Sequence, residues 1–196
     1  MQFFNKSDKS NILVSLATVT FLLILVGITI FYFVNYTKQA TADQIITDIE
    51  LLGKTFKKID ETAVIRDFNS PKSTINYLNI KKGGFVGSEV GPMNLVHPDK
   101  WEGPYFRDNP MIENKEYQVV KTRNGYYVVP GDGVKLPNGK IMGTDVIIDQ
   151  STDIEELTKS GNDLNYKDRP LATFIPTAAS RIAQLADDLI ITDQEM

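Results

Sequence analysis

A long apolar stretch lies near the N-terminus, and most of the polar residues follow it. No residue from Ser10 to Thr37 carries a formal charge, and Ile12–Val34 is apolar apart from scattered Ser, Thr and Gly. About 20 apolar residues are enough to cross the hydrocarbon core of a bilayer as an α-helix. The pattern therefore predicts a transmembrane anchor over residues 11–35, preceded by a short N-terminus of residues 1–10.

The residues around this span predict its type and its orientation. A signal-peptide core covers about 7–15 apolar residues and ends at a cleavage site of small residues. No such site follows Val34, so we expect an uncleaved signal-anchor. Lys6 and Lys9 precede the span and Lys38 follows it. Because positive charge stays on the cytoplasmic side, we expect a cytoplasmic N-terminus, one membrane crossing and an extracytoplasmic C-terminal domain.

A different pattern follows the span, with apolar residues three or four positions apart. This spacing predicts an amphipathic helix over residues 36–70. Its apolar stripe can pair with a second copy as a coiled coil or pack on the chain's own sheet, and the sheet is favoured because the stripe is short. The stripe consists of Ile45, Ile49, Leu52, Phe56, Ile59 and Ala63, and the charged residues that fall off it are Asp48, Glu50, Lys54, Lys57, Lys58 and Asp60.

Residues 71–196 are expected to form an extracytoplasmic α+β head. The polar run from Asp67 to Pro71 is expected to end the long helix. We expect a short helix over Ser73–Ile80 and a loop over the glycine- and proline-rich residues 81–100.

Strand signals become clear in the middle of the head. Glu116–Thr122 and Tyr126–Val129 are rich in β-forming residues, and Asn124-Gly125 between them predicts a hairpin with a type I′ turn. Val146–Ile148 is predicted to be a further strand. Three or more strands with an apolar face become stable when they pack on a helix, so the sequence predicts a small antiparallel sheet against the long helix.

Two further helices are predicted after these strands. Thr152–Glu155 has the pattern of a capping box and predicts a short helix that ends before Gly161. An extra C-terminal helix is predicted over Thr177–Ile191, with apolar residues such as Ile182 on one face.

Composition narrows the possible functions. The net charge of -4 and the pI of about 5.1 argue against a nucleic-acid partner. The absence of cysteine excludes disulfides, thiolate catalysis and cysteine metal sites. His97 is the single histidine, and Ser88 and Asp99 near it form no known catalytic pattern. We therefore expect a protein that is not an enzyme.

One segment between the predicted helix and sheet resembles a known family. Trp101–Tyr105, with the sequence WEGPY, is similar to the W-x-G-P-Y segment of the major pseudopilins of type II secretion. Glu116–Val119 and Gly125–Val128 resemble the first two strands of that family, and Pro130–Gly133 resembles the turn after them. Together with the order of helix and sheet, the similarity to type IV pilins and pseudopilins covers about residues 11–135.

The resemblance implies a pilin-like fold in a bacterial inner membrane, with the head in the periplasm. The family carries a glycine before the apolar run and a glutamate early in the helix, which serve processing and filament assembly. Neither residue is found at the corresponding place here, and a second W-G-x-P-Y segment is missing because Trp101 is the only tryptophan. Processing and polymerisation are therefore not implied by the resemblance.

Two sites in the head have alternative interpretations. Trp101–Tyr105 is a recognition loop or, as we favour, a structural cover of the core. The second site holds four oxygen-bearing side chains, which are suitable ligands for calcium and for which the family resemblance also implies calcium. The same residues can instead cap the next helix, and apart from this calcium we expect no cofactor. The four residues are Asp145, Asp149, Ser151 and Asp153.

Two classes of function are therefore open. The first is a membrane-anchored pilin-like or pseudopilin-like structural subunit of a secretion, pilus or uptake machinery. Its partners would be the lipid bilayer and other pilin-like or secretion-machinery subunits, including copies of itself. The second is a single-pass, membrane-tethered extracytoplasmic binding or sensory domain. An exported hydrolase is disfavoured because no catalytic constellation is visible.

Overall fold

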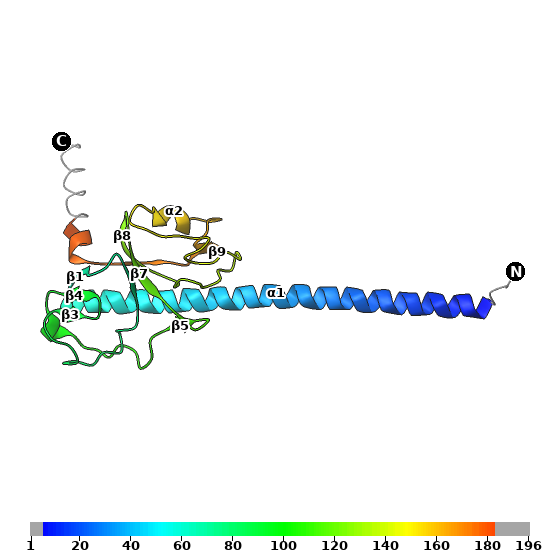
Figure 1. Cartoon of the computed structure of the whole chain (residues 1–196), viewed down its shortest axis with the longest axis horizontal. Coiled ribbons are helices and arrows are strands. Elements are labelled where there is room, and N and C mark those ends of the chain that lie inside the picture. The colour runs from blue at the N-terminus through cyan, green and yellow to red at the C-terminus, as the bar shows by residue number, and fades with distance from the viewer. Residues whose placement is uncertain (1–5, 183–196) are drawn as a thin grey trace, which may run out of the picture. The chain divides into compact units, whose positions relative to one another are not determined.

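The computed structural model describes residues 6–182 of the 196-residue chain, with side chains from Val14 onward. The chain divides into two compact units, which are Met1–Ala40 and Thr41–Met196. The first helix, α1 (Lys6–Ala63), is continuous through both of them (Figure 1). The fold is α+β, as predicted, because this helix is followed by small antiparallel sheets.

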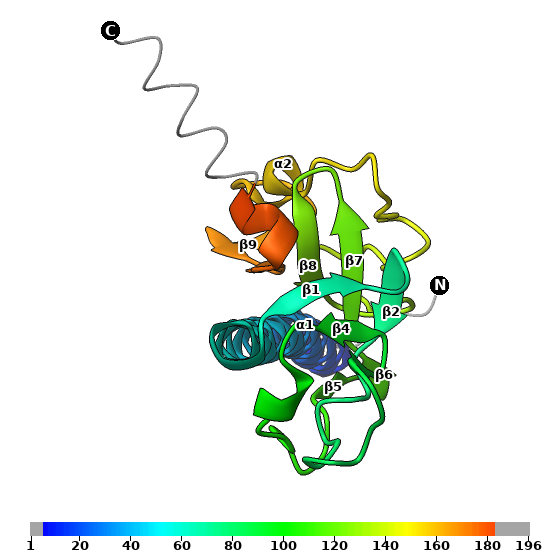
Figure 2. The same ribbon diagram turned by 90° about the vertical axis from the view of Figure 1, so that its left-hand side faces the viewer.

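The second half of α1 supplies much of the core of the second unit. All six predicted stripe residues are at most 2% exposed, and they belong to one cluster with side chains from the strands. Figure 2 shows α1 end-on beside β7 and β8. The stripe therefore packs within the chain, as we favoured over a coiled coil.

The largest sheet contains the predicted hairpin. Its four antiparallel strands lie in the order β11-β8-β7-β2. The turn differs from the predicted type I′ turn, because Thr122 pairs with Gly125 and the turn residues are Arg123 and Asn124. Among residues 122–125, only Gly125 has a positive φ, which is 121°. The strands are β2 (Lys72–Thr74), β7 (Gln118–Thr122), β8 (Gly125–Val129) and β11 (Thr173–Ile175).

A second sheet lies where no strand was predicted. It has the order β1-β4-β3, so residues 81–100 contain a hairpin and a 3-10 helix as well as loop. The predicted helix Ser73–Ile80 is wrong, because Ser73 and Thr74 pair with β7 and no helix follows them. The elements are β1 (Ile65–Phe68), β3 (Glu89–Val90), β4 (Met93–Leu95) and η1 (Pro98–Lys100).

The long helix ends earlier than the predicted boundary at residue 70. Val64 has a φ of 57°, a left-handed conformation more often taken by glycine after a helix. The side chain of Asp60 accepts a hydrogen bond from the Ile65 N–H at 3.0 Å, and the Ala63 carbonyl accepts one from the His97 N–H at 2.9 Å. These contacts stabilise the turn from α1 into β1.

The remaining elements are short. Val146–Ile148 forms no strand, since only Val146 makes an isolated bridge, to Met142. The short helix α2 (Ile154–Thr158) is present, but its cap is Asp153, which accepts from the Glu156 N–H. Two further hairpins are β5 (Met111–Ile112) with β6 (Lys115–Glu116), and β9 (Asn165–Tyr166) with β10 (Arg169–Pro170).

The predicted C-terminal helix falls partly outside the described residues. Residues 178–182 are helical, and Thr177 begins this helix by exchanging hydrogen bonds with Ser180. The part predicted over residues 183–191 lies beyond the described range.

Gly53 allows α1 to approach β11 closely. A Cβ atom at this position would lie 2.9 Å from Thr173 Oγ1 and 3.0 Å from Thr173 Cγ2. Such distances are too short for a side chain without movement of its neighbour. A glycine within a helix costs about 1 kcal/mol relative to alanine, and close packing explains why it is tolerated here.

We predict that Gly53→Ala lowers the free energy of unfolding by about 1–3 kcal/mol, because it overpacks this contact. Adding Thr173→Ala removes both crowding atoms, so the double variant should recover this loss. Chemical denaturation followed by circular dichroism measures both effects. Equal loss in the single and the double variant would contradict the proposed crowding.

Candidate functional site

The first candidate site is the apolar surface of α1 between residues 14 and 36. Its large apolar side chains are between 43% and 73% exposed, on every side of the helix. The hydroxyls of Thr18, Thr20 and Thr29 donate to carbonyls four residues earlier, at 2.8–2.9 Å. Each of these hydroxyls therefore has a hydrogen-bond partner within the helix. A polar group in an apolar solvent needs such a partner, because no water is there to provide one.

This segment is long and apolar enough to cross a membrane. Tyr32 and Tyr36 are 70% and 73% exposed near its C-terminal end, where amphipathic rings favour the lipid headgroups. One face of the helix also has a shallow, open groove of about 420 Å³. Its lining residues are Ile28, Thr29, Tyr32, Phe33 and Tyr36.

Trp101 and Gly103 of the segment Trp101–Tyr105 are buried in the second unit, whereas Glu102 and Pro104 are exposed. Trp101 is fully buried, and its Nε1–H donates to the Ile80 carbonyl at 3.0 Å. Its ring packs against the Tyr105 ring in a T-shaped arrangement, with the ring centroids 4.9 Å apart. A Cβ atom at Gly103 would overlap both the Trp101 indole and the Ile80 carbonyl. These contacts favour the structural interpretation of the segment.

We predict that Trp101→Phe lowers the free energy of unfolding by about 2 kcal/mol. The smaller ring leaves a cavity and removes the hydrogen bond to Ile80. Glu102→Gln is the matched control, because Glu102 reaches Lys58 only through an exposed ion pair of 3.0 Å and should change stability by less than about 0.5 kcal/mol. A Trp101→Phe protein as stable as the control would contradict the structural role.

The four proposed calcium ligands are engaged in local hydrogen bonds. Asp149 accepts from the Ser151 and Thr152 hydroxyls at 2.7 Å and 3.0 Å, and these bonds lower its pKa. Asp145 accepts from the Ile141 N–H at 2.8 Å, and Asp153 caps α2. Within the described residues, no group of three or more His, Asp or Glu side chains is placed to hold a metal ion.

The calcium site stays a prediction with a direct test. If Asp145, Asp149, Ser151 and Asp153 bind calcium, the ion should raise the melting temperature of the purified protein, and Asp149→Asn should remove most of that increase. Differential scanning fluorimetry with calcium and with chelator measures it. An unchanged melting temperature would eliminate the site.

The His97 side chain is exposed, and the residue contacts α1 through its backbone N–H. The His97 N–H donates to the last residue of α1, and the residue precedes η1 without a side-chain cap. The described hydrogen bonds do not join its imidazole to Ser88 or Asp99, the two neighbours considered from the sequence.

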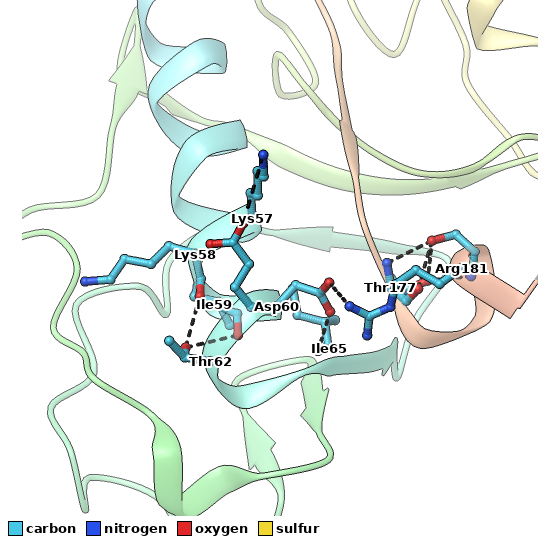
Figure 3. Close-up of polar contacts among 10 residues, drawn as sticks. Lys57, Lys58, Ile59, Asp60, Thr62, Ile65, Thr177 and Arg181 are labelled. Atoms are coloured by element: carbon cyan, nitrogen blue, oxygen red, sulfur yellow. Dashed lines mark hydrogen bonds and ion pairs between the residues drawn. The ribbon is translucent and has the colours of Figure 1, made fainter. Parts of the chain in front are cut away.

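A polar site that the sequence did not predict lies at the C-terminal end of α1 (Figure 3). Asp60 is only 3% exposed, although its position off the stripe suggested a solvated charge. Its Oδ1 accepts from the Ile65 N–H, and its Oδ2 accepts from Arg181 Nη1 at 2.6 Å. No local pattern signals this pair, because its members are far apart in the chain.

A second carboxylate of α1 is also partly buried. Asp48 Oδ2 accepts a hydrogen bond from the Tyr117 hydroxyl at 2.9 Å. Burial raises the pKa of Asp48, although its hydrogen bonds with Tyr117 and Gln44 act in the opposite direction. Burial likewise raises the pKa of Asp60 above its usual 3.8, and the Ile65 N–H and Arg181 offset this only in part.

A groove of about 620 Å³ adjoins the Asp60–Arg181 pair. Gly53, Thr173, Phe174 and Pro176 contribute its less polar lining. Its charged lining carries both signs and consists of Glu50, Lys54, Lys57, Asp60, Glu61 and Arg181.

Compared with models of protein families, with curated proteins and with solved structures, the chain matches none of them.

Proposed function

We propose that this protein is a membrane-anchored, pilin-like structural subunit of a secretion, pilus or uptake machinery. It acts through helix packing and protein–protein contacts, without catalysis. The N-terminus is cytoplasmic and the head is extracytoplasmic, in a bacterial inner membrane. Its partners are lipid and other pilin-like or secretion-machinery subunits, including its own copies.

The observation that carries this proposal is the division of one helix between two environments. Between Val14 and Tyr36, α1 exposes apolar side chains on all sides, whereas Ile45 to Ala63 bury one stripe in the head. An all-round apolar helix suits lipid, and a striped helix suits a sheet. The WEGPY segment and the strands after it add the resemblance to pseudopilins.

The groove on the apolar segment supports lateral packing between copies. Helices in lipid associate by van der Waals packing of complementary surfaces rather than by a hydrophobic driving force. The shallow, open groove bordered by Thr29, Tyr32 and Tyr36 offers a surface for a neighbouring helix. A tethered binding or sensory domain is the second candidate, and it would need the anchor only as a tether.

Single cysteines in this cysteine-free chain test the proposal. Tyr32→Cys lies in the groove, and Val34→Cys is the matched control on nearly the opposite side of the helix, because residues two positions apart differ by about 200°. For a pilin-like subunit we expect retention in carbonate-washed membranes and efficient oxidative crosslinking through Tyr32→Cys only.

The outcomes separate the candidates. Membrane retention without crosslinking would favour the tethered domain over the packed subunit. Recovery of the protein in the soluble fraction would contradict both. Protease added outside spheroplasts should remove the head while the N-terminus stays protected, and the reverse pattern would overturn the proposed orientation.

A further inference from the structure

We propose that two hairpins of the head form a polar collar beside α1 that rests on phospholipid headgroups, with Lys115 and Lys167 binding the phosphate groups. The collar consists of the β5–β6 hairpin, Met111–Glu116, and the β9–β10 hairpin, Asn165–Pro170. Figures 1 and 2 show β5 and β9 on different sides of α1. This inference rests on the proposed membrane anchor and goes beyond it, because it gives the head a lipid-binding surface of its own.

Two contacts with α1 set the direction of the β5–β6 hairpin. The Tyr117 hydroxyl donates to Asp48, and one helical turn earlier Gln44 Nε2 donates to the Met111 carbonyl at 3.2 Å. The hairpin therefore runs from Tyr117 toward the N-terminal side of α1. Its turn, residues 113–114, follows Met111 by two positions and lies at the end of the hairpin on that side.

The β9–β10 hairpin is held at the same level of the helix. Arg169 Nη1 donates to Asp43 Oδ1 at 2.8 Å, and its turn directly precedes Arg169. Asp43 follows Tyr36, the last large apolar side chain of the exposed segment, by seven residues. Seven residues span about 10 Å as a helix and about 25 Å at full extension. The chain itself therefore keeps both hairpins near the end of the segment proposed to lie in lipid.

Both turns have a backbone conformation that is costly for part of their residues. Among the residues that the structure describes, five other than glycine have a positive φ, and four of them form these two turns. The values are 50° at Glu113, 58° at Asn114, 51° at Lys167 and 64° at Asp168. Asparagine and aspartate suit such positions, whereas glutamate and lysine adopt them at a cost. Costly backbone conformations cluster at functional positions, so these exposed turns are candidates for contacts outside the chain.

Lys115 and Lys167 are the cationic groups of the collar that remain available to a ligand. Both are exposed, and within residues 6–182 neither has an ion-pair partner, whereas Arg169 is paired with Asp43. Lys167 Nζ lies 5.2 Å from the centroid of the Tyr166 ring. A basic group beside a half-buried aromatic ring suits the headgroup region of a bilayer.

The carboxylates of the collar favour a zwitterionic surface over a strongly anionic one. Glu113, Glu116 and Asp168 lie in the same two hairpins as the lysines. The Glu113 carboxylate also accepts from the Lys135 N–H at 3.4 Å. Headgroups that carry a phosphate and an ammonium group can pair with both signs, with the phosphate taking the lysines. Phosphatidylcholine is therefore a suitable probe.

Lysine footprinting of the full-length protein tests the collar. A membrane-impermeant, amine-reactive ester is applied to the protein in maltoside micelles and in phosphatidylcholine nanodiscs, and mass spectrometry gives the reaction rate of each lysine. We expect the rates at Lys115 and Lys167 to fall severalfold in nanodiscs. Lys121 is the matched control, because it is exposed and its Nζ lies 5.9 Å from the Tyr126 ring. Its rate should not change.

Lys38 separates the collar from the anchor, because it follows Tyr36 by two residues and should be protected wherever the anchor is inserted. Protection of Lys38 without Lys115 and Lys167 would overturn the collar alone. No protection at any of the three would overturn the collar and the anchor together. The collar also fails if Lys121 is protected equally, or if inorganic phosphate protects Lys115 and Lys167 in micelles, since the site would then bind a free anion.

A spin label gives a second measurement. Pro170→Cys places the label at an exposed position of β10 in this cysteine-free chain. In nanodiscs we expect the label to be less mobile than in micelles, and the combined change Lys115→Gln and Lys167→Gln should abolish this difference. Lys121→Gln should keep it. Equal mobility in nanodiscs for the labelled parent, the double variant and the control would overturn the collar.

Discussion

The burial of one stripe of α1 is the interaction on which the head depends. Its strands are only two to five residues long, and strands of that length need a helix and a shared apolar face to be stable. The stripe from Ile45 to Ala63 supplies that face. Phe56 meets Phe68 of β1 with ring centroids 6.2 Å apart, and Phe68 meets Tyr126 of β8 at 4.9 Å. The helix thereby joins both larger sheets in one core.

The N-terminal part of the same helix has a different surface, which is long and apolar enough to cross a membrane. Between residues 14 and 36 the apolar side chains point to all sides, and the threonine hydroxyls bond to the helix backbone. Lipid offers no hydrogen-bond partners, so a continuous helix is the element that can pass from lipid to protein without leaving polar groups unpaired. In the proposed membrane anchor, the change from an all-round to a striped pattern would mark where the surroundings of the helix change from lipid to protein.

Local patterns predicted the features that depend on neighbouring residues. The stripe and the β7–β8 hairpin follow from spacings within a few residues, and both are confirmed. The end of α1 was missed because Val64, a β-branched residue, takes a conformation that Asp60 and His97 stabilise through contacts outside the helix. The β3–β4 hairpin was missed because its strands have only two and three residues, too few to show an alternating pattern.

The candidate sites likewise differ in whether neighbouring residues or distant contacts determine them. The apolar segment is visible in the sequence because most of its consecutive positions are apolar and none is charged. Asp60 is next to Ile59 at the edge of the stripe, so its burial is decided by what covers that edge rather than by periodicity. Part of that surrounding comes from Arg181, 121 positions away, which donates a hydrogen bond to Asp60. Two residues so far apart in the chain share no local spacing, so no pattern in the sequence marks their contact.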